Sequence, residues 1–316
     1  MVDLVVETPR LRPLMFSIAY RMLGSVSEAE DVVQAGLLRM HERVRGGEVI
    51  DRPDAFASTV ATRLSIDVLR SARRTREVYV GPWLPEPLLA DDADPAHRIE
   101  FDETLSVGVL TMLERLGPVE RAVFVLHEAL GFDYGEIGGI VERDPAACRQ
   151  IMHRARRRLA ADGARFEVDA SEAARLASEF LEALREGDVD GVVRLLATDV
   201  VMTADGGGKA PAIQHPMSGD VAVARFLVGL MRRGDALGVE VEEAVANGER
   251  TLLFRGRDGA VLSVLTLHVD GGVVRSLTNQ LNPDKLGHLG PVGDLFALLR
   301  DGAAGAAEPA GEPPTA

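Results

Sequence analysis

Arginines are concentrated in two short stretches of this 316-residue sequence. Residues 149–165 hold six arginines and one acidic residue, and residues 63–76 hold five arginines and one acidic residue. Guanidinium groups bind phosphates and the edge of guanine, so both stretches are suited to nucleic acid. The formal net charge of −14 does not exclude such binding, because a DNA-binding surface is a local property.

The stretch that contains residues 149–165 has the pattern of a helix-turn-helix. Asp133 and Glu136 have capping-box spacing and predict the start of a first helix. After a short turn, Asp144 and Pro145 predict the start of a second helix. Helical spacing gives the second helix one apolar face, formed by Cys148, Ile151, Met152, Ala155 and Leu159. We expect the opposite, basic face to meet DNA; the alternative is two core helices with a solvated arginine face.

Residues 9–76 are predicted to be entirely helical. Ser27 and Glu30 have capping-box spacing and predict the start of one helix. Pro53 opens the next helix, which carries the first arginine stretch.

Three segments resemble, in order, blocks of the extracytoplasmic-function sigma factors of bacteria. LRPLMFSIAYRMLGSVSEAEDVVQ resembles the first conserved block, and DAFASTVATRLSIDVLRSARR resembles the helix that meets the minus-10 promoter element. LGPVERAVFVLHEALGFDYGEIGGIVERDPAACRQIMHRARRRL resembles region 4, which reads the minus-35 element. The resemblance implies a sigma factor, which does no bond chemistry and lends promoter specificity to RNA polymerase core. Glu142 departs from the pattern, because glycine is common at that place in the helix-helix turn.

The resemblance implies roles for three groups of residues. Arg149, Gln150 and His153 suit base edges of the minus-35 element, since Arg suits guanine and Gln suits adenine. The arginines expected to meet minus-35 phosphates are Arg154, Arg156 and Arg157. The arginines expected to follow the minus-10 strand are Arg63, Arg70, Arg73 and Arg74. The residues expected to contact RNA polymerase core are Asp31, Gln34, Leu38 and Arg39, for which a solvated helix face is the alternative.

Residues 169–285 have a different pattern. Helical stretches are followed by β-rich runs with turns at Asn247-Gly248, Asp258-Gly259 and Asp270-Gly271-Gly272, which predicts an α+β domain with a curved antiparallel sheet. The order resembles the SnoaL-like polyketide-cyclase domain, a cone with a central pocket. The whole chain then resembles the sigma-factor subgroup with this domain fused at its C-terminus. We therefore expect a multidomain protein, with two all-α sigma domains followed by an α+β cone.

Three segments resemble signatures of that subgroup: WLPEPL, DGGGK and NPDKL. The chain has 33 arginines and two lysines, and both lysines lie in the last two segments, which favours a specific need for an ammonium group. The residues expected to make a regulatory contact are Trp83, Leu84, Asp205, Gly206, Gly207, Gly208, Lys209, Asn282, Pro283 and Lys285. DGGGK could dock on the sigma half, beside WLPEPL or NPDKL. The alternatives are a tight turn with a solvated lysine and a phosphate-binding loop.

The C-terminal domain has three candidate roles: protein-contact regulation in cis, ligand sensing and catalysis. Catalysis would draw on Asp205, His215 and His268, although spacing alone shows no paired acid and base. One competing hypothesis is a helix-turn-helix repressor with a ligand-binding domain, and another is a SnoaL-type enzyme with a regulatory N-terminus. We favour the regulated sigma factor, whose partners would be RNA polymerase core, promoter DNA and, as one option, a small-molecule ligand.

Composition restricts the setting of this function. No stretch of 18 or more apolar residues exists, so we expect no membrane span. The lone Cys148 can form neither an internal disulfide nor a cysteine-based zinc site, so we expect a reduced cytoplasm and neither metal nor cofactor. The expected divisions are sigma region 2 at 9–76, a linker at 77–100, region 4 at 101–165, the SnoaL-like domain at 169–285, and a short helix with a disordered tail at 286–316.

Overall fold

The computed structural model describes residues 4–76, 79–90, 105–160 and 170–305. The chain divides into two compact units. The first unit contains Met1–Ala170 and Ala244–Arg250, and the second contains Ser171–Glu243 and Thr251–Ala316. Among the described residues, no helix combines the length and the hydropathy that crossing a membrane requires.

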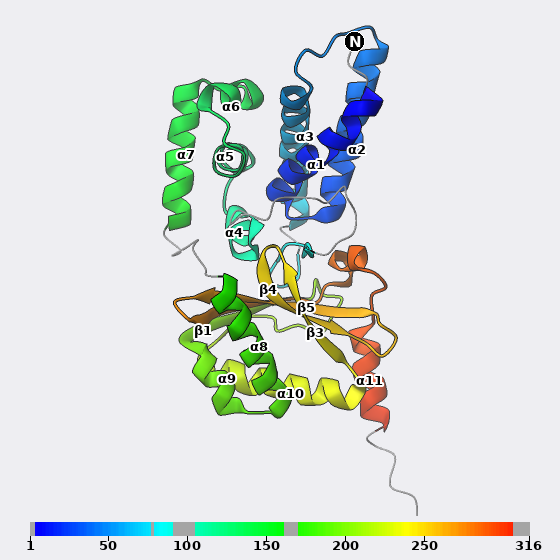
Figure 1. The fold of residues 1–316 in the computed structure, drawn as a ribbon, viewed down its shortest axis with the longest axis vertical. Coiled ribbons are helices and arrows are strands. Elements are labelled where there is room, and N and C mark those ends of the chain that lie inside the picture. The colour runs from blue at the N-terminus through cyan, green and yellow to red at the C-terminus, as the bar shows by residue number, and fades with distance from the viewer. Residues whose placement is uncertain (1–3, 77–78, 91–104, 161–169, 306–316) are drawn as a thin grey trace, which may run out of the picture. The chain divides into compact units, whose positions relative to one another are not determined.

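The first three helices form an antiparallel bundle (Figure 1): α1 (Leu4–Leu23), α2 (Val26–Arg45) and α3 (Pro53–Arg76). Large apolar side chains such as Phe16 and Met40 are fully buried between them. The expected start of α2 at Ser27 is wrong. Ser25 is the N-cap, and its side chain accepts a hydrogen bond from the Glu28 backbone nitrogen. Ser25 and Ser27 both have a glutamate three residues later, so the capping pattern could not distinguish them.

The helix-turn-helix also belongs to the first unit. It is preceded by α4 (Val107–Leu113), α5 (Pro118–Phe124) and a π-helical turn, η3 (Val125–Ala129), and is formed by α6 (Tyr134–Val141) and α7 (Pro145–Ala160). Asp133 and Glu136 form the predicted capping box at the start of α6. One apolar cluster joins the α1–α3 bundle to these helices, so the two parts share a continuous core.

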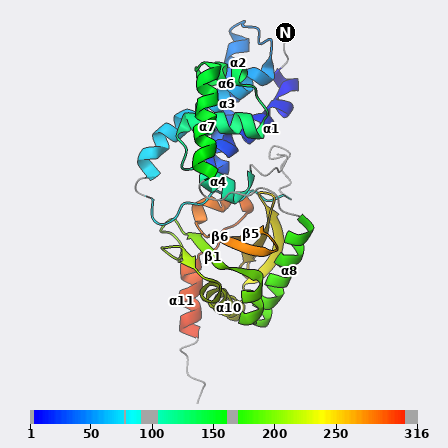
Figure 2. The same ribbon diagram turned by 90° about the vertical axis from the view of Figure 1, so that its left-hand side faces the viewer.

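The second unit contains helices and one mixed sheet (Figure 2). Its helices are α8 (Ala170–Glu186), α9 (Val189–Leu195), α10 (Asp220–Leu237) and α11 (Leu295–Gly305), with short turns η4 (Pro283–Lys285) and η5 (Gly287–Leu289). Its strands are β1 (Leu196–Asp205), β2 (Met217–Ser218), β3 (Glu240–Ala246), β4 (Glu249–Arg255), β5 (Val261–Asp270) and β6 (Val273–Gln280). The tip of the β3–β4 hairpin belongs to the first unit.

The sheet has the order β2-β1-β6-β5-β4-β3. Helices α8, α9 and α10 share an apolar core with one face of this sheet, which confirms the α+β prediction. The expectation of a purely antiparallel sheet is wrong, because β1 pairs in parallel with β6. Consecutive strands joined by tight turns must be antiparallel, whereas the pairing of the first long strand with the last is a long-range choice that turn patterns do not reveal.

Candidate functional site

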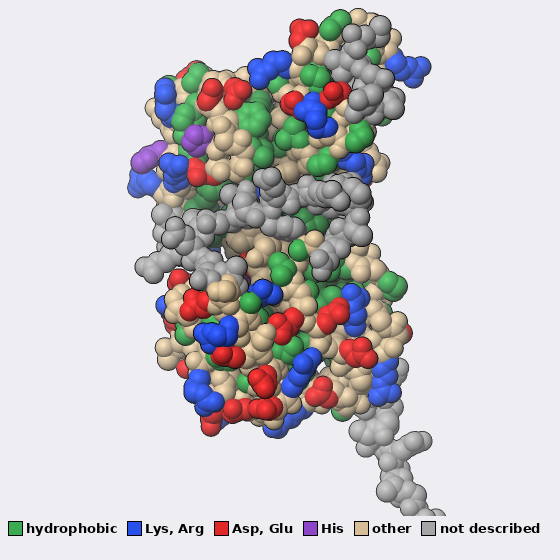
Figure 3. Space-filling view, viewed as in Figure 1, with side chains coloured by type: hydrophobic (Ala, Val, Ile, Leu, Met, Phe, Trp, Pro, Cys, Tyr) green, Lys and Arg blue, Asp and Glu red, His purple; other side chains and the backbone are tan. Residues whose placement is uncertain are grey.

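The exposed face of α7 carries the residues expected to read DNA. The helix starts as predicted, since the Asp144 side chain accepts a hydrogen bond of 2.9 Å from the Ala147 backbone nitrogen. The predicted apolar face is buried, whereas Arg149, Gln150 and His153 are exposed on the other side. Figure 3 shows basic and histidine side chains gathered over α7. Burial raises the pKa of the Cys148 thiol on the inner face, so this cysteine is a packing residue.

An aromatic side chain that sequence reasoning missed lies beside Arg149. The Arg149 guanidinium carbon is 5.9 Å from the centre of the Tyr134 ring, within the range of a cation–π contact. The Tyr134 hydroxyl lies 3.1 Å from His127 Nε2, and the two rings stack. His127 Nδ1 lies 3.0 Å from the Phe132 carbonyl oxygen. Tyr134, itself held by His127, therefore packs beside the arginine that is expected to face a base. The sequence did contain one signal for this contact, because Tyr134 is an aromatic residue at the first position of α6, the helix that precedes α7.

The flanking arginines differ in their surroundings. Arg154 and Arg157 are exposed. Arg156 Nε donates to Glu128 Oε1 over 3.2 Å, so an acidic neighbour already offsets part of its charge. Arg158 is likewise paired with Glu120, so the net positive charge of this face comes mainly from Arg154 and Arg157.

The turn between α6 and α7 has an unusual conformation at Glu142. This residue adopts φ +56° and ψ 52°, the left-handed region, which disfavours residues other than glycine by about 1–2 kcal/mol. Gly138 has a separate steric reason, since a Cβ atom there would lie 2.5 Å from the Arg143 carbonyl oxygen. The absence of a side chain at Gly138 therefore permits the tight turn, while the glycine expected at 142 is replaced by a strained glutamate.

The arginines expected to follow the minus-10 strand lie on α3. Arg63 donates hydrogen bonds to the carbonyl oxygens of Gly139 and Ile140 at the end of α6. Arg70 is exposed and lies 3.5 Å from Asp67. The side chains of Arg73 and Arg74 lie outside the described part of the structure.

The residues expected to contact RNA polymerase lie on α2. Asp31, Gln34, Leu38 and Arg39 are all exposed, and they follow helical spacing along one side of the helix. Leu38 has 58% of its surface exposed. An apolar side chain surrounded by polar neighbours on a helix face is typical of an interaction surface, although a single exposed leucine is common on any protein.

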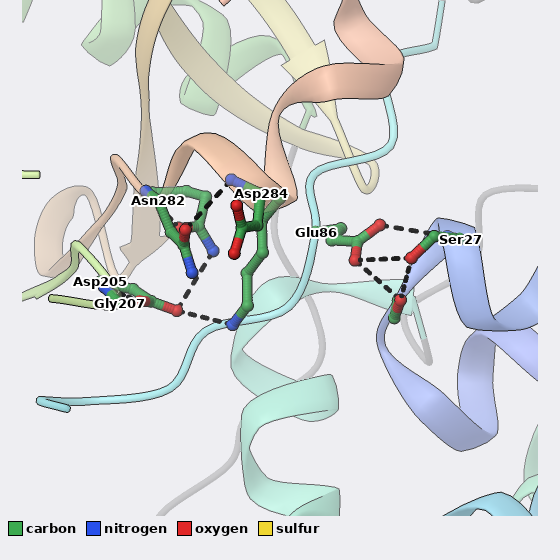
Figure 4. Close-up of polar contacts among 9 residues, drawn as sticks. Ser27, Glu86, Asp205, Gly207, Asn282 and Asp284 are labelled. Carbon is green, nitrogen blue, oxygen red and sulfur yellow. Dashed lines mark hydrogen bonds and ion pairs between the residues drawn. The ribbon is translucent and has the colours of Figure 1, made fainter. Parts of the chain in front are cut away.

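The WLPEPL segment packs on the corner between α1 and α2. Leu84 is buried and Trp83 is half-buried against Gly24, where a Cβ atom would lie 2.7 Å from the indole ring. The Glu86 carboxylate accepts hydrogen bonds from the Ser25 hydroxyl and the Val26 backbone nitrogen, each over 2.7 Å (Figure 4). Glu86 therefore caps α2 from a distant part of the chain, a role that sequence reasoning missed.

The same segment pairs with the tip of the β3–β4 hairpin inside the first unit. Leu89 and Ala246 form an antiparallel bridge, and the Ala90 backbone nitrogen donates to the Val245 carbonyl oxygen over 2.9 Å. The Asn247 side-chain oxygen accepts from the Leu88 backbone nitrogen over 3.0 Å. Residues 88–90 thus bond to the hairpin tip through an isolated β-bridge and the hydrogen bonds on either side of it.

Tyr20 completes this arrangement. Its hydroxyl donates to the Glu86 carbonyl oxygen over 2.6 Å and accepts from the Asn247 side-chain nitrogen over 2.6 Å. Burial raises the pKa of Tyr20 well above its ordinary value, so the hydroxyl keeps its proton and can donate. Neither Tyr20 nor Asn247 was singled out from the sequence, except as part of the Asn-Gly turn signal.

The DGGGK and NPDKL segments meet within the second unit (Figure 4). Lys285 Nζ lies 2.7 Å from Asp205 Oδ2, and both side chains are buried. Lys209 pairs with Asp284, and both of these side chains are exposed. A Cβ atom at Gly207 would lie 2.2 Å from the Asn282 side-chain nitrogen, so glycine allows the close approach. Pro283 begins the short turn η4 that presents Lys285.

The backbone of DGGGK forms a tight turn. The Lys209 and Ala210 backbone nitrogens both donate to the Gly206 carbonyl oxygen, and Gly207 and Gly208 adopt positive φ. The Asp205 carboxylate accepts from the Gly207 backbone nitrogen over 3.0 Å. The carboxylate that faces the glycine backbone is itself an anion, which disfavours phosphate binding there.

Two of the three candidate acid and base groups, His268 and Asp205, have structural partners. His268 Nε2 lies 2.9 Å from the Thr278 hydroxyl, Asp205 is paired with Lys285, and His215 is exposed. Within the part of the chain that the structure describes, no group of three or more His, Cys, Asp and Glu side chains could hold a metal ion.

Comparison with known proteins supplies independent information. The chain matches family models for Sigma-70 region 2 over residues 9–75, Sigma-70, region 4 over residues 106–159, and a SnoaL-like domain over residues 177–274. It is 36% identical over 291 residues to the ECF RNA polymerase sigma factor SigJ of Mycobacterium tuberculosis, covering 89% of this chain and 92% of the relative. It is 30% identical over 280 residues to the probable ECF RNA polymerase sigma factor SigI of the same species, covering 87% of this chain and 92% of the relative.

A solved structure is similar over nearly the whole chain. The crystal structure of the M. tuberculosis extracytoplasmic function sigma factor SigJ matches with a TM-score of 0.74 and 33% identity. The match covers 90% of this chain and 98% of that chain. The expected fold class, helical sigma domains followed by a SnoaL-like α+β domain, is confirmed.

Proposed function

The chain belongs to the extracytoplasmic-function RNA polymerase sigma factors, and we propose that its SnoaL-like domain modulates this activity in cis. A sigma factor directs RNA polymerase to specific promoters and so starts transcription. The matches to both sigma regions favour this role over a helix-turn-helix repressor, which has no need of region 2.

The minus-35 element would be read from α7. Arg149 is supported by the Tyr134 ring and exposed beside Gln150 and His153, which suits direct contact with base edges. The phosphate contacts would come from Arg154, Arg156 and Arg157. The minus-10 strand would be followed by the α3 arginines Arg63, Arg70, Arg73 and Arg74, and RNA polymerase core would meet α2 at Asp31, Gln34, Leu38 and Arg39.

Regulation in cis is supported chiefly by the pairing of residues 88–90 with the β3–β4 hairpin tip. The hairpin is built from the C-terminal half of the sequence, but its tip is bonded to the linker and to Tyr20. Glu86 connects that linker to the start of α2, and Trp83 packs against Gly24 just before that helix. A change in the C-terminal domain that moved the hairpin tip would therefore pull on α1 and α2.

DGGGK and NPDKL would act as an internal brace of the C-terminal domain. Four residues make the contact across the two segments: Asp205, Lys209, Asp284 and Lys285. This brace would hold the ends of β1 and β6 in one conformation and so support a regulatory contact made by the domain. The C-terminal domain would not be an enzyme, since the Asp205 carboxylate forms an ion pair with Lys285. A small-molecule ligand is one means of changing the conformation of this domain. The protein would act in the cytoplasm, where RNA polymerase works.

The test is transcription in vitro with purified core polymerase and a library of promoter fragments. We expect full-length protein to produce discrete start sites that are absent with core alone. Asn247→Gly should change the yield while leaving the start sites in place, because it loosens the hairpin tip and leaves α7 and α3 unaltered. DNA binding without any start site would favour the repressor. An unchanged yield with Asn247→Gly would contradict regulation through the hairpin.

A further inference from the structure

We propose that Arg63 and Glu142 form a clasp between the minus-10 helix and the helix-turn-helix in the free protein, and that promoter binding must release it. The inference rests on the proposed role of Arg63 at the minus-10 element. It adds a competition between that role and a contact inside the protein.

Arg63 bonds to the helix-turn-helix through two of its three guanidinium nitrogens, Nε and Nη2. Arg63 Nε donates to the Ile140 carbonyl oxygen over 2.9 Å, and Nη2 donates to the Gly139 carbonyl oxygen over 3.1 Å. These carbonyls lie in the last turn of α6, where oxygens have no partner within the helix and attract cations. Arg63 Nη2 also lies 3.2 Å from Glu142 Oε1.

The backbone of Glu142 is strained where its carboxylate meets Arg63. Its φ of +56° lies in the region that favours glycine, so a glutamate here needs a reason. The side chain reaches across to α3 and meets Arg63, which carries the opposite charge. The ion pair gives the strained glutamate a contact with α3 that a glycine at this position could not make.

The clasp and DNA compete for one side chain. With Nε and Nη2 bonded to Gly139, Ile140 and Glu142, the guanidinium cannot offer these two nitrogens as a paired donor to a phosphate or a base of the minus-10 strand. Other contacts join the same two parts, including the hydrogen bond of 2.8 Å from Arg121 to the Met22 carbonyl oxygen. In the closed form α3 and the helix-turn-helix are in contact, and in the open form they are apart. The clasp therefore shifts the equilibrium between these two forms, to which other contacts also contribute.

The balance can be measured as a distance between α2 and α7 in the full-length protein. Nitroxide labels would be placed on cysteines introduced at exposed Glu42 and Ala146, and pulsed electron–electron resonance would give the distance distribution. Native Cys148 is buried and serves as the control, because protein without introduced cysteines should take up no label.

Two variants of Glu142 separate charge from strain. Glu142→Gln keeps the strained backbone and removes the charge, whereas Glu142→Gly removes both. We expect each to raise the population of longer distances about two- to fivefold, the size expected for an exposed ion pair. In an Arg63→Met background, Glu142→Gln should add nothing further. An unchanged distribution in both variants, or an equal effect in the Arg63→Met background, would overturn the clasp.

Transcription with unlabelled protein tests the competition itself. At limiting protein concentration, Glu142→Gln should raise transcript yield by a similar factor, because less of the protein is closed. A shifted distance with an unchanged yield would overturn the competition. If no variant and no wild-type protein supports transcription, the proposed function fails while the distance result still judges the clasp.

Discussion

The side-chain nitrogen of Asn247 lies 2.6 Å from the hydroxyl oxygen of Tyr20, although 227 positions separate the two residues in the sequence. Both residues are buried. The Tyr20 hydroxyl donates a hydrogen bond to the Glu86 carbonyl oxygen, and the Asn247 side-chain oxygen accepts one from the Leu88 backbone nitrogen. One asparagine therefore connects a helix of the sigma bundle, the linker and the turn of a hairpin.

Replacing Asn247 by glycine should loosen this connection without disturbing the turn. Asn247 has φ +55°, which glycine adopts freely, so the backbone is unstrained in the variant. The Leu88 amide loses its acceptor and the Tyr20 hydroxyl loses its donor, so we expect hydrogen exchange at residues 88–90 to accelerate roughly tenfold. Tyr20→Phe is the matched control, since it removes the hydroxyl to which Asn247 donates and keeps the acceptor for Leu88. Unaltered exchange in the glycine variant would show that the side chain does not hold the linker.

The two lysines provide a matched pair for stability. Lys285 is buried beside Asp205, so Lys285→Met removes the ammonium group that balances a buried carboxylate and should destabilise the second unit by about 3–5 kcal/mol. Lys209 pairs with Asp284 on the surface, so Lys209→Met should cost at most about 1 kcal/mol. Hydrogen exchange of the β1 and β6 amides in urea measures both. Equal losses in the two variants would contradict the distinction that burial makes here.

The cap that Glu86 places on α2 predicts graded losses. Glu86→Gln keeps an acceptor for the Val26 backbone nitrogen but loses the charge that favours a helix N-terminus, so we expect a cost of about 1 kcal/mol. Glu86→Ala leaves buried donors without this acceptor and should cost about 2–3 kcal/mol. Trp83 is the single tryptophan of the chain and packs at the same corner, so its fluorescence in urea reports both. A larger loss for glutamine than for alanine would be inconsistent with capping.

Promoter binding should separate base contacts from phosphate contacts on α7. Arg149→Lys should lower discrimination at one base pair by about 1–3 kcal/mol, because lysine lacks the planar fork of arginine. Arg154→Gln should weaken all sequences alike and reduce the salt dependence by about one phosphate contact. Binding of holoenzyme to single-substitution promoters at several salt concentrations gives both quantities. Loss of discrimination in the Arg154 variant alone would reverse the two assigned roles.

Local patterns predicted much of the first unit correctly. The capping box at Asp133 and Glu136, the start of α7 after Asp144, and the buried face of α7 all appear as expected. The start of α2 was misplaced because two serines fit the same pattern, and Glu86 supplies the additional contacts at Ser25. The parallel pairing of β1 with β6 was missed because turn signals describe only neighbouring strands.

The sequence by itself determined the helix-turn-helix, the family resemblance and the placement of basic residues, because capping and periodic burial depend on residues within a few turns of one another. Only the tertiary structure decided which distant groups meet. Three pairs of residues illustrate this: Lys285 with Asp205, Arg63 with Glu142, and Asn247 with Tyr20. None of these pairs has a sequence spacing that a helix or a hairpin imposes. Such pairs depend on how whole elements pack, since the packing of the elements brings charges and donors within bonding distance.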